Sequence, residues 1–211
     1  PWTGPFDLLV TGVGGTGVVT VGALAAMAAH LEGKQASVLD FMGFAQKGGA
    51  VLSFVRLALT PDELNQVRID TQQADLVLAC DMVVGASADA LGTVKPGRIA
   101  NTHELATAAF VRDPDASLHA DALLDKMRHA AGDGRVFTAD AQAIAQRMLG
   151  DTLPANIVML GVAFQHGLVP VGEAALMRVV ELNGVAVEIN KTAFALGRLA
   201  VAAPQALQRL E

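Results

Sequence analysis

A glycine-rich turn between two apolar runs constrains the fold of this chain more than any other feature. Residues 6–11 form a short apolar run that stops at glycines, which predicts a buried strand. The sequence GVGGTG follows at 12–17, and the alanine-rich run at 18–31 predicts a helix that ends before Gly33. Because the uncharged stretch at 8–29 contains this turn, it is better explained by a strand, a turn and a helix than by a membrane span.

The spacing of the glycines in this turn indicates a site for an anionic group. We expect Gly12 to allow the tight turn, Gly14 to let backbone approach a phosphate, and Gly17 to allow close helix–strand packing. The free N–H groups at the start of the helix favour an anion. Asp40, at the end of the next predicted strand, stands where an acid would bind a ribose. Such a turn also occurs where a loop only packs against a partner domain.

Strands alternate with helices along the chain. Further strands are predicted at 36–40, 51–59, 74–81, 97–101 and 136–139, and further helices at 61–67, 83–91, 120–131, 140–149, 155–166, 173–182 and 184–203. This order predicts an α/β fold. We expect a three-layer Rossmann-like, mostly parallel sheet with helices on both faces and a helical C-terminal region, in a single domain over residues 1–211.

The composition excludes several classes of protein. Fifteen Lys and Arg against 21 Asp and Glu give a net charge of −6, which excludes the basic footprint of a nucleic-acid-binding protein. Charged residues make up 17% of the chain, against about 25% in ordinary soluble domains. Hydrophobic residues make up 52%, which excludes disorder. We therefore expect part of the surface to be covered by partners.

The cysteine and histidine content argues against a metal centre held by this chain. Cys80 is the one cysteine, so the chain can form neither an internal disulfide nor a cysteine-ligated iron–sulfur cluster, and a small buried hydrophobe is expected there. The five histidines show no metal-ligand spacing, so no metal site is expected. Gly132-Asp133-Gly134 followed by Asn156 is similar to a magnesium–diphosphate motif, but Asp-Gly also commonly ends a helix.

A second glycine-rich loop follows the second predicted strand, on the same side of the sheet as the first. Lys47 could meet an anion there, and Gly48 and Gly49 would let another backbone come close. A wide turn with a solvated lysine fits the same residues. Arg56 lies in an apolar strand, where an ion pair or an interface contact is expected rather than chemistry.

Several spaced segments resemble one known family, the gamma subunit or domain of 2-oxoacid:ferredoxin oxidoreductases. The segments are GVGGTGVVTVGALAA at 12–26, FAQKGGAVLSFVRLA at 44–58, ADLVLACD at 74–81, NIVMLGVAFQHGLVP at 156–170 and VELNGVAVEINKTAFALGR at 180–198. The AQKGG form and the run VLDFMGFAQKGG look most like the indolepyruvate, or arylpyruvate, branch.

The resemblance implies a part in the oxidative decarboxylation of a 2-oxoacid to an acyl-CoA, with electrons passed to ferredoxin. Thiamine diphosphate, Mg and the iron–sulfur clusters then belong to partner domains or subunits, and this chain, which has no catalytic residue, is inactive alone. The coenzyme A side of the active site is the part associated with the gamma unit. The cofactor-binding or interface positions carried over are Gly12, Gly14, Gly15, Thr16, Gly17, Gln46, Lys47, Gly48 and Gly49.

Two other functions fit the residues without the resemblance. A stand-alone NAD(P)-dependent dehydrogenase could use the same glycine turn, and so could a purely structural interaction domain. Bacterial members of the indolepyruvate branch often carry this unit at the end of a long fused chain, which would explain why the sequence starts at Pro1 without Met. Because no basic segment and apolar core of a signal peptide opens the sequence, a cytoplasmic location is expected.

Overall fold

The computed structural model describes most of the chain outside the two glycine loops and a long central stretch. The described residues are 5–13, 17–42, 50–64, 74–80, 105–106, 125, 129, 137 and 139–210. The strands are β1 Phe6–Val13, β2 Gln35–Met42, β3 Ala50–Ala58, β4 Leu76–Ala79 and β5 Leu105–Ala106. The helices are α1 Val18–Leu31, the 3₁₀ helix η1 Pro61–Leu64, α5 Ala141–Leu149, α6 Ala155–Gln165, α7 Glu173–Asn183, α8 Val187–Ala202 and α9 Pro204–Leu210.

The five strands form one sheet in the order β2-β3-β1-β4-β5. Strand β1 is parallel to β4, and β4 is parallel to β5, whereas β3 is antiparallel to both β1 and β2. Four of the five strands therefore point in one direction. The reversed direction of β3 follows from its short connection to β2, since a parallel crossover needs about a dozen residues or more. The predicted α/β fold with a mostly parallel sheet is confirmed.

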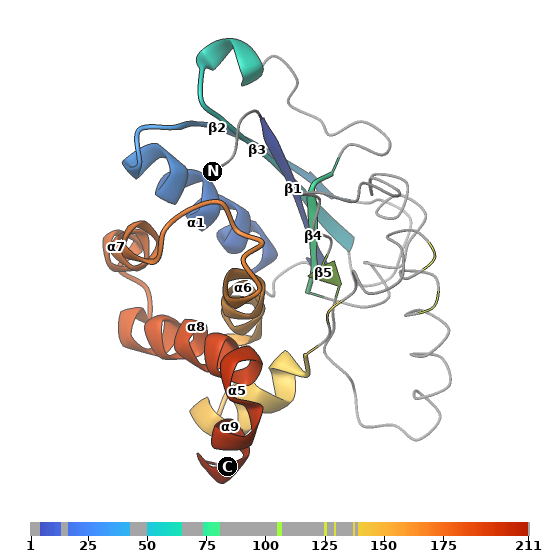
Figure 1. Ribbon diagram of the computed structural model, residues 1–211, viewed down its shortest axis with the longest axis vertical. Helices are drawn as coiled ribbons and strands as arrows, with labels where there is room; N and C mark the ends of the chain where they lie inside the picture. The colour runs from blue at the N-terminus through green and yellow to red at the C-terminus, as the bar shows by residue number, and fades with distance from the viewer. Residues whose placement is uncertain are drawn as a thin grey trace.

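Helix α1 and helices α5 to α9 lie on one side of the sheet (Figure 1). Helices α1 and α6 lie next to the strands, and α7 and α8 form an outer layer with α9 at the end of the chain. Helix α6 is buried over nine consecutive residues because it lies between the α1–sheet layer and α8. A Cβ added at Gly161 would overlap the carbonyl of Phe194, and one at Gly197 would overlap that of Val158, so these glycines allow α6 and α8 to cross closely.

Some predicted elements lie outside the described residues. These are the helix at 83–91, the strand at 97–101 and all but two residues of the helix at 120–131. The prediction of a strand at 136–139 is wrong at its two described residues, Phe137 and Ala139, which are not in a strand. Phe137 and Ala139 pack against the core without joining the sheet, and the Phe137 ring stacks on His166 with centroids 4.0 Å apart.

Candidate functional site

The two glycine loops leave the sheet at the same edge. The register pairs Val13 with Ala50 and Met42 with Val51, so the carboxyl ends of β1 and β2 lie beside the amino end of β3. Thr11 pairs with Ala79 at the end of β4. In open α/β sheets, ligands bind outside the carboxyl ends of the strands. Residues 14–16 and 43–49 lie outside the described part, but the first loop starts after Val13, which pairs with Ala50, the residue that follows the second loop.

The described glycines of the turn have different roles from those predicted. Gly12 is buried in β1, and a Cβ there would overlap Cγ2 of Val18 at the start of α1. Gly17 is exposed and has a φ of +86°, a left-handed conformation that glycine adopts without strain. Close helix–strand packing therefore depends on Gly12, and the turn conformation depends on Gly17. The glycine spacing alone predicts these two roles the other way round.

Helix α1 begins without a side-chain cap. Its N-cap residue is Gly17, and the first turn contains no acidic residue. Val19 and Thr20 are exposed in that turn. Its first N–H groups have no partner within the helix, and the helix dipole gives them a partial positive charge. The N–H groups at this end of α1 can therefore donate hydrogen bonds to an anionic group or to a carbonyl oxygen.

Asn156 is a site residue that the sequence analysis did not place beside the glycine turn. It is the second residue of α6, it is 7% exposed, and its Nδ2 lies 3.8 Å from where a Cβ of Gly17 would be. The signal in the sequence is an amide at the start of a helix whose following residues, 157–164, are apolar. The magnesium–diphosphate hypothesis linked Asn156 to residues 132–134, which lie outside the described part of the chain.

The position of Asp40 does not support binding of a ribose. Ser53 Oγ donates a hydrogen bond of 2.6 Å to Asp40 Oδ1. In a dinucleotide-binding sheet, the strand that carries the ribose acid lies directly beside the first strand. Here β3 lies between β2 and β1. Asp40 therefore does not support the alternative of a stand-alone NAD(P)-dependent dehydrogenase.

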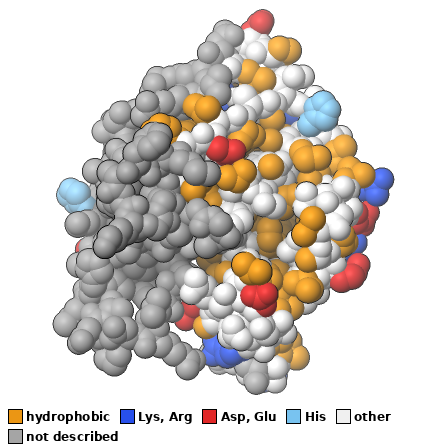
Figure 2. Space-filling view, turned by 180° about the vertical axis from the view of Figure 1, so that it is seen from behind, with side chains coloured by type: hydrophobic (Ala, Val, Ile, Leu, Met, Phe, Trp, Pro, Cys, Tyr) orange, Lys and Arg blue, Asp and Glu red, His pale blue; other side chains and the backbone are white. Residues whose placement is uncertain are grey.

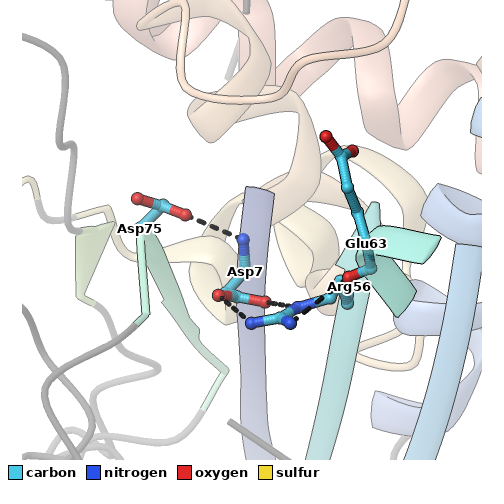
Figure 3. Close-up of polar contacts among 4 residues, drawn as sticks. All are labelled: Asp7, Arg56, Glu63 and Asp75. Carbon is cyan, nitrogen blue, oxygen red and sulfur yellow. Dashed lines mark hydrogen bonds and ion pairs between the residues drawn. The ribbon is translucent and has the colours of Figure 1, made fainter. Parts of the chain in front are cut away.

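At the opposite edge of the sheet, Arg56 forms the ion pair that was predicted as one of its two roles (Figure 3). Its Nε and Nη2 donate to the two carboxylate oxygens of Asp7, at 2.6 and 2.9 Å. Nη1 donates to the carbonyl of Glu63 at 3.4 Å. The N–H of Asp7 donates to a carboxylate oxygen of Asp75 at 2.8 Å. Asp7 is buried and the Arg56 side chain is 12% exposed, so this pair fixes β3 against β1.

The described residues contain no group of three or more His, Cys, Asp or Glu side chains that could hold a metal ion. Cys80 directly follows β4, is only partly buried, and packs against the core. Among the helices that the structure describes, none is long and apolar enough to cross a membrane.

Three groups in the C-terminal helices have shifted pKa values. Partial burial lowers the pKa of His166. Hydrogen bonds from Lys191 and Arg178 lower the pKa of Glu181, and the hydrogen bond to Glu181 raises the pKa of Lys191. These groups lie in or beside the C-terminal helices, far along the chain from the glycine turn.

The chain matches one protein family over nearly its whole length. Residues 7–200 match the model of the pyruvate ferredoxin/flavodoxin oxidoreductase family. The chain belongs to this family. Its relatives include the indolepyruvate oxidoreductase subunit IorB of Methanothermobacter thermautotrophicus, which is 28% identical over 75% of this chain and 77% of its own length. The IorB subunit of Thermococcus kodakarensis is 23% identical over 91% of this chain and 94% of its own length.

Solved structures of this oxidoreductase family share the fold. Pyruvate oxidoreductase subunit PORC of Thermotoga maritima has a TM-score of 0.64 at 20% identity, covering 93% of this chain and 96% of its own. The 2-oxoglutarate:ferredoxin oxidoreductase of Magnetococcus marinus, solved with 2-oxoglutarate, coenzyme A and succinyl-CoA, has a TM-score of 0.68 at 18% identity. This alignment covers all of our chain but 32% of the Magnetococcus chain, so the same fold occurs there within a longer polypeptide.

Proposed function

We propose that this chain is the gamma-type component of a 2-oxoacid:ferredoxin oxidoreductase that acts on indolepyruvate or a related arylpyruvate. The support is its membership of the pyruvate ferredoxin/flavodoxin oxidoreductase family together with IorB relatives that align over most of their own length. The AQKGG segment at 45–49, which resembles the arylpyruvate branch, supports the same substrate class.

In this proposal the reaction is completed only with other domains of the enzyme. A 2-oxoacid is decarboxylated and oxidised, its acyl group is transferred to the thiol of coenzyme A, and the electrons leave through iron–sulfur clusters to ferredoxin. With one cysteine, this chain cannot ligate such a cluster by itself, so the clusters belong to partner domains or subunits. We propose that the thiamine diphosphate and its Mg are bound there too. Our chain contributes binding and orientation rather than a reacting side chain.

One observation supports a role in coenzyme A binding. Val13 and Ala50, which flank the two glycine loops, pair at one edge of the sheet, and α1 begins there without a side-chain cap. The backbone N–H groups at the start of α1 suit the phosphate groups of coenzyme A, and we propose that Lys47, from the loop that follows β2 in the chain, adds a cation. The glycines of the two loops would let the backbone approach a ligand closely. The proposed contact residues are Gly12, Gly14, Gly15, Thr16, Gly17, Gln46, Lys47, Gly48 and Gly49.

The surface supports the proposal of partner domains. Figure 2 shows hydrophobic side chains spread over the described part of one face, with few charged ones between them. Large hydrophobic side chains are exposed on α1, on the edge strand β2 and around the α7–α8 turn, and include Met27, Leu31, Leu39, Phe41, Leu182, Val185 and Ile189. We propose that the thiamine-binding and iron–sulfur domains of the same enzyme cover part of this surface, with residues 1–211 as one domain.

The test is turnover by the complete enzyme isolated from its source. We expect reduction of a viologen acceptor that depends on both indolepyruvate and coenzyme A, with the acyl-CoA product identified by mass spectrometry. Pyruvate is the control substrate, and it should give a lower kcat/KM. Turnover by the isolated chain would contradict the supporting role, and faster turnover with pyruvate would contradict the arylpyruvate assignment.

A further inference from the structure

One edge of the sheet is an open strand of eight residues. Among the strands that the structure describes, β2 pairs with β3 alone and so ends the sheet, while the strand at the other end, β5, spans two residues. The backbone N–H and C=O groups on the outer side of an edge strand are free to pair with another strand. Val38, Leu39 and Phe41 are 36%, 38% and 47% exposed, so this edge is open to solvent in the isolated chain.

Strand β2 lacks the features by which proteins commonly protect an edge, which are lysines, prolines and β-bulges. It contains no lysine or proline, and its pairing with β3 runs from Gln35 to Met42 without a bulge. Its one charged residue is Asp40, whose Oδ1 accepts a hydrogen bond of 2.6 Å from Ser53 Oγ of β3. This carboxylate is held toward the neighbouring strand inside the sheet, so the outer edge remains unprotected.

The strand that matches this edge in length and charge is β2 of a second copy. Two identical antiparallel strands at the edge of a sheet are related by a two-fold axis perpendicular to the sheet, so residues on the same face lie opposite each other. A pair centred on Val38 places Asp40 opposite Ala36, and the two carboxylates are then four positions apart along the strands. A pair centred on Asp40 would oppose like charges directly, and one centred on Leu39 would place them diagonally. The charge of Asp40 therefore favours Val38 as the centre.

We propose that two copies of this chain associate in the complete enzyme through antiparallel pairing of β2 with β2, centred on Val38. Their two sheets then form one continuous sheet, and neighbours across the new pair cover the side chains of Val38 and Leu39. Helix α1 packs on β2 and β3 and exposes Met27 and Leu31, so it extends the apolar surface beside this edge. The inference goes beyond the proposed function, since it does not depend on the substrate.

The test is disulfide trapping in the complete enzyme with Val38→Cys, with Leu39→Cys as the matched control. In the proposed register the two Val38 positions lie directly opposite, where Cα atoms are about 4.5–5.5 Å apart, within the range of a disulfide. The two Leu39 positions are diagonal, about 7–8 Å apart, and are too distant to be bridged. Because the two side chains are almost equally exposed, random collisions in solution would oxidise both variants alike.

We expect Val38→Cys to give, after mild oxidation, a disulfide-linked dimer of this chain on non-reducing electrophoresis. The yield should be about fivefold or more above that of Leu39→Cys and of the wild type, in which Cys80 is the one cysteine. A higher yield from Leu39→Cys would overturn the register. No crosslink in either variant, or a crosslink to a different chain of the enzyme, would overturn pairing with a second copy. This readout does not use turnover, so its failure would leave the proposed function standing.

Discussion

The two ends of β1 differ in whether their polar groups are paired within the chain. At its amino end, Asp7 forms a two-bond ion pair with Arg56, and the side chains are 5% and 12% exposed. At its carboxyl end, Gly12 and Gly17 remove side chains, the next helix begins without a cap, and the nearby Asn156 is neutral. The amino end pairs its charges within the chain, whereas the carboxyl end leaves backbone N–H groups for a ligand or partner.

This difference shows how one sheet can be both rigid and open. Charge that is buried for structure needs an internal partner, because a buried unpaired charge is strongly destabilising. A binding edge needs the reverse, since groups that are already satisfied inside the chain have nothing to offer a ligand. Substitutions at the amino end should therefore act on stability, and substitutions at the carboxyl end should act on binding.

The largest expected effect is at the amino end. Arg56→Met removes the partner of a buried carboxylate, so we expect the free energy of unfolding to fall by about 3–5 kcal/mol, measured by denaturant titration. The double variant Asp7→Leu with Arg56→Met removes both charges and should recover most of that loss. If the double variant is no more stable than Arg56→Met, the loss does not come from an uncompensated charge.

A smaller effect is expected from replacing the glycines at the two ends of α1. Gly17 and Gly33 have φ values of +86° and +78°, and a Cβ would meet one atom, at 3.8 Å, at Gly17 and none within 4 Å at Gly33. Replacing either with Ala should cost about 1–2 kcal/mol of stability, because both positions need the left-handed conformation. Only Gly17→Ala should also raise the KM for coenzyme A in the complete enzyme. Equal KM values in the two variants would argue that the start of α1 has no part in binding.

The smallest expected effect is on the pH dependence of stability and comes from His166, which lies at neither end of β1. It is the reference for the two larger effects. Burial lowers the pKa of His166, so the folded chain binds a proton there less readily than the unfolded chain does. This contribution to stability is present above the unfolded pKa of His, about 6.5, and is lost as the pH falls below it. We expect thermal melts between about pH 7.5 and pH 5.5 to show a smaller loss of stability in His166→Gln than in wild type. An equal loss in both would contradict this role for His166.

Local features of the sequence were enough to place most of the described elements. The alanine-rich run predicted α1 with its observed bounds, and the helices predicted at 140–149, 155–166 and 173–182 match α5, α6 and α7 within one residue at each end. Features that depend on tertiary contacts were harder to predict. The direction of β3 depends on its pairing with β1, and Arg56 meets Asp7 across 49 positions of sequence.

The candidate site could be predicted in part for the same reason. The glycine turn and the AQKGG loop are local motifs, and the expectation that both lie on one side of the sheet agrees with the pairing of Val13 and Ala50. The exchange of roles between Gly12 and Gly17 depends on where Val18 lies in the folded chain. The place of Asn156 depends on how α6 packs against α1, which no local pattern encodes.

We propose above all that the carboxyl end of β1, with the two glycine loops, binds coenzyme A in the complete enzyme. The most direct measurement is the KM for coenzyme A in the complete enzyme carrying Lys47→Ala, with Lys191→Ala as the control. Lys191 pairs with Glu181 at 2.7 Å on the C-terminal helices, so its loss removes one cation far along the chain from the glycine turn. We predict that Lys47→Ala raises this KM about tenfold with little change in kcat, while Lys191→Ala leaves it unchanged. Equal KM values in both variants and the wild type would contradict the claim.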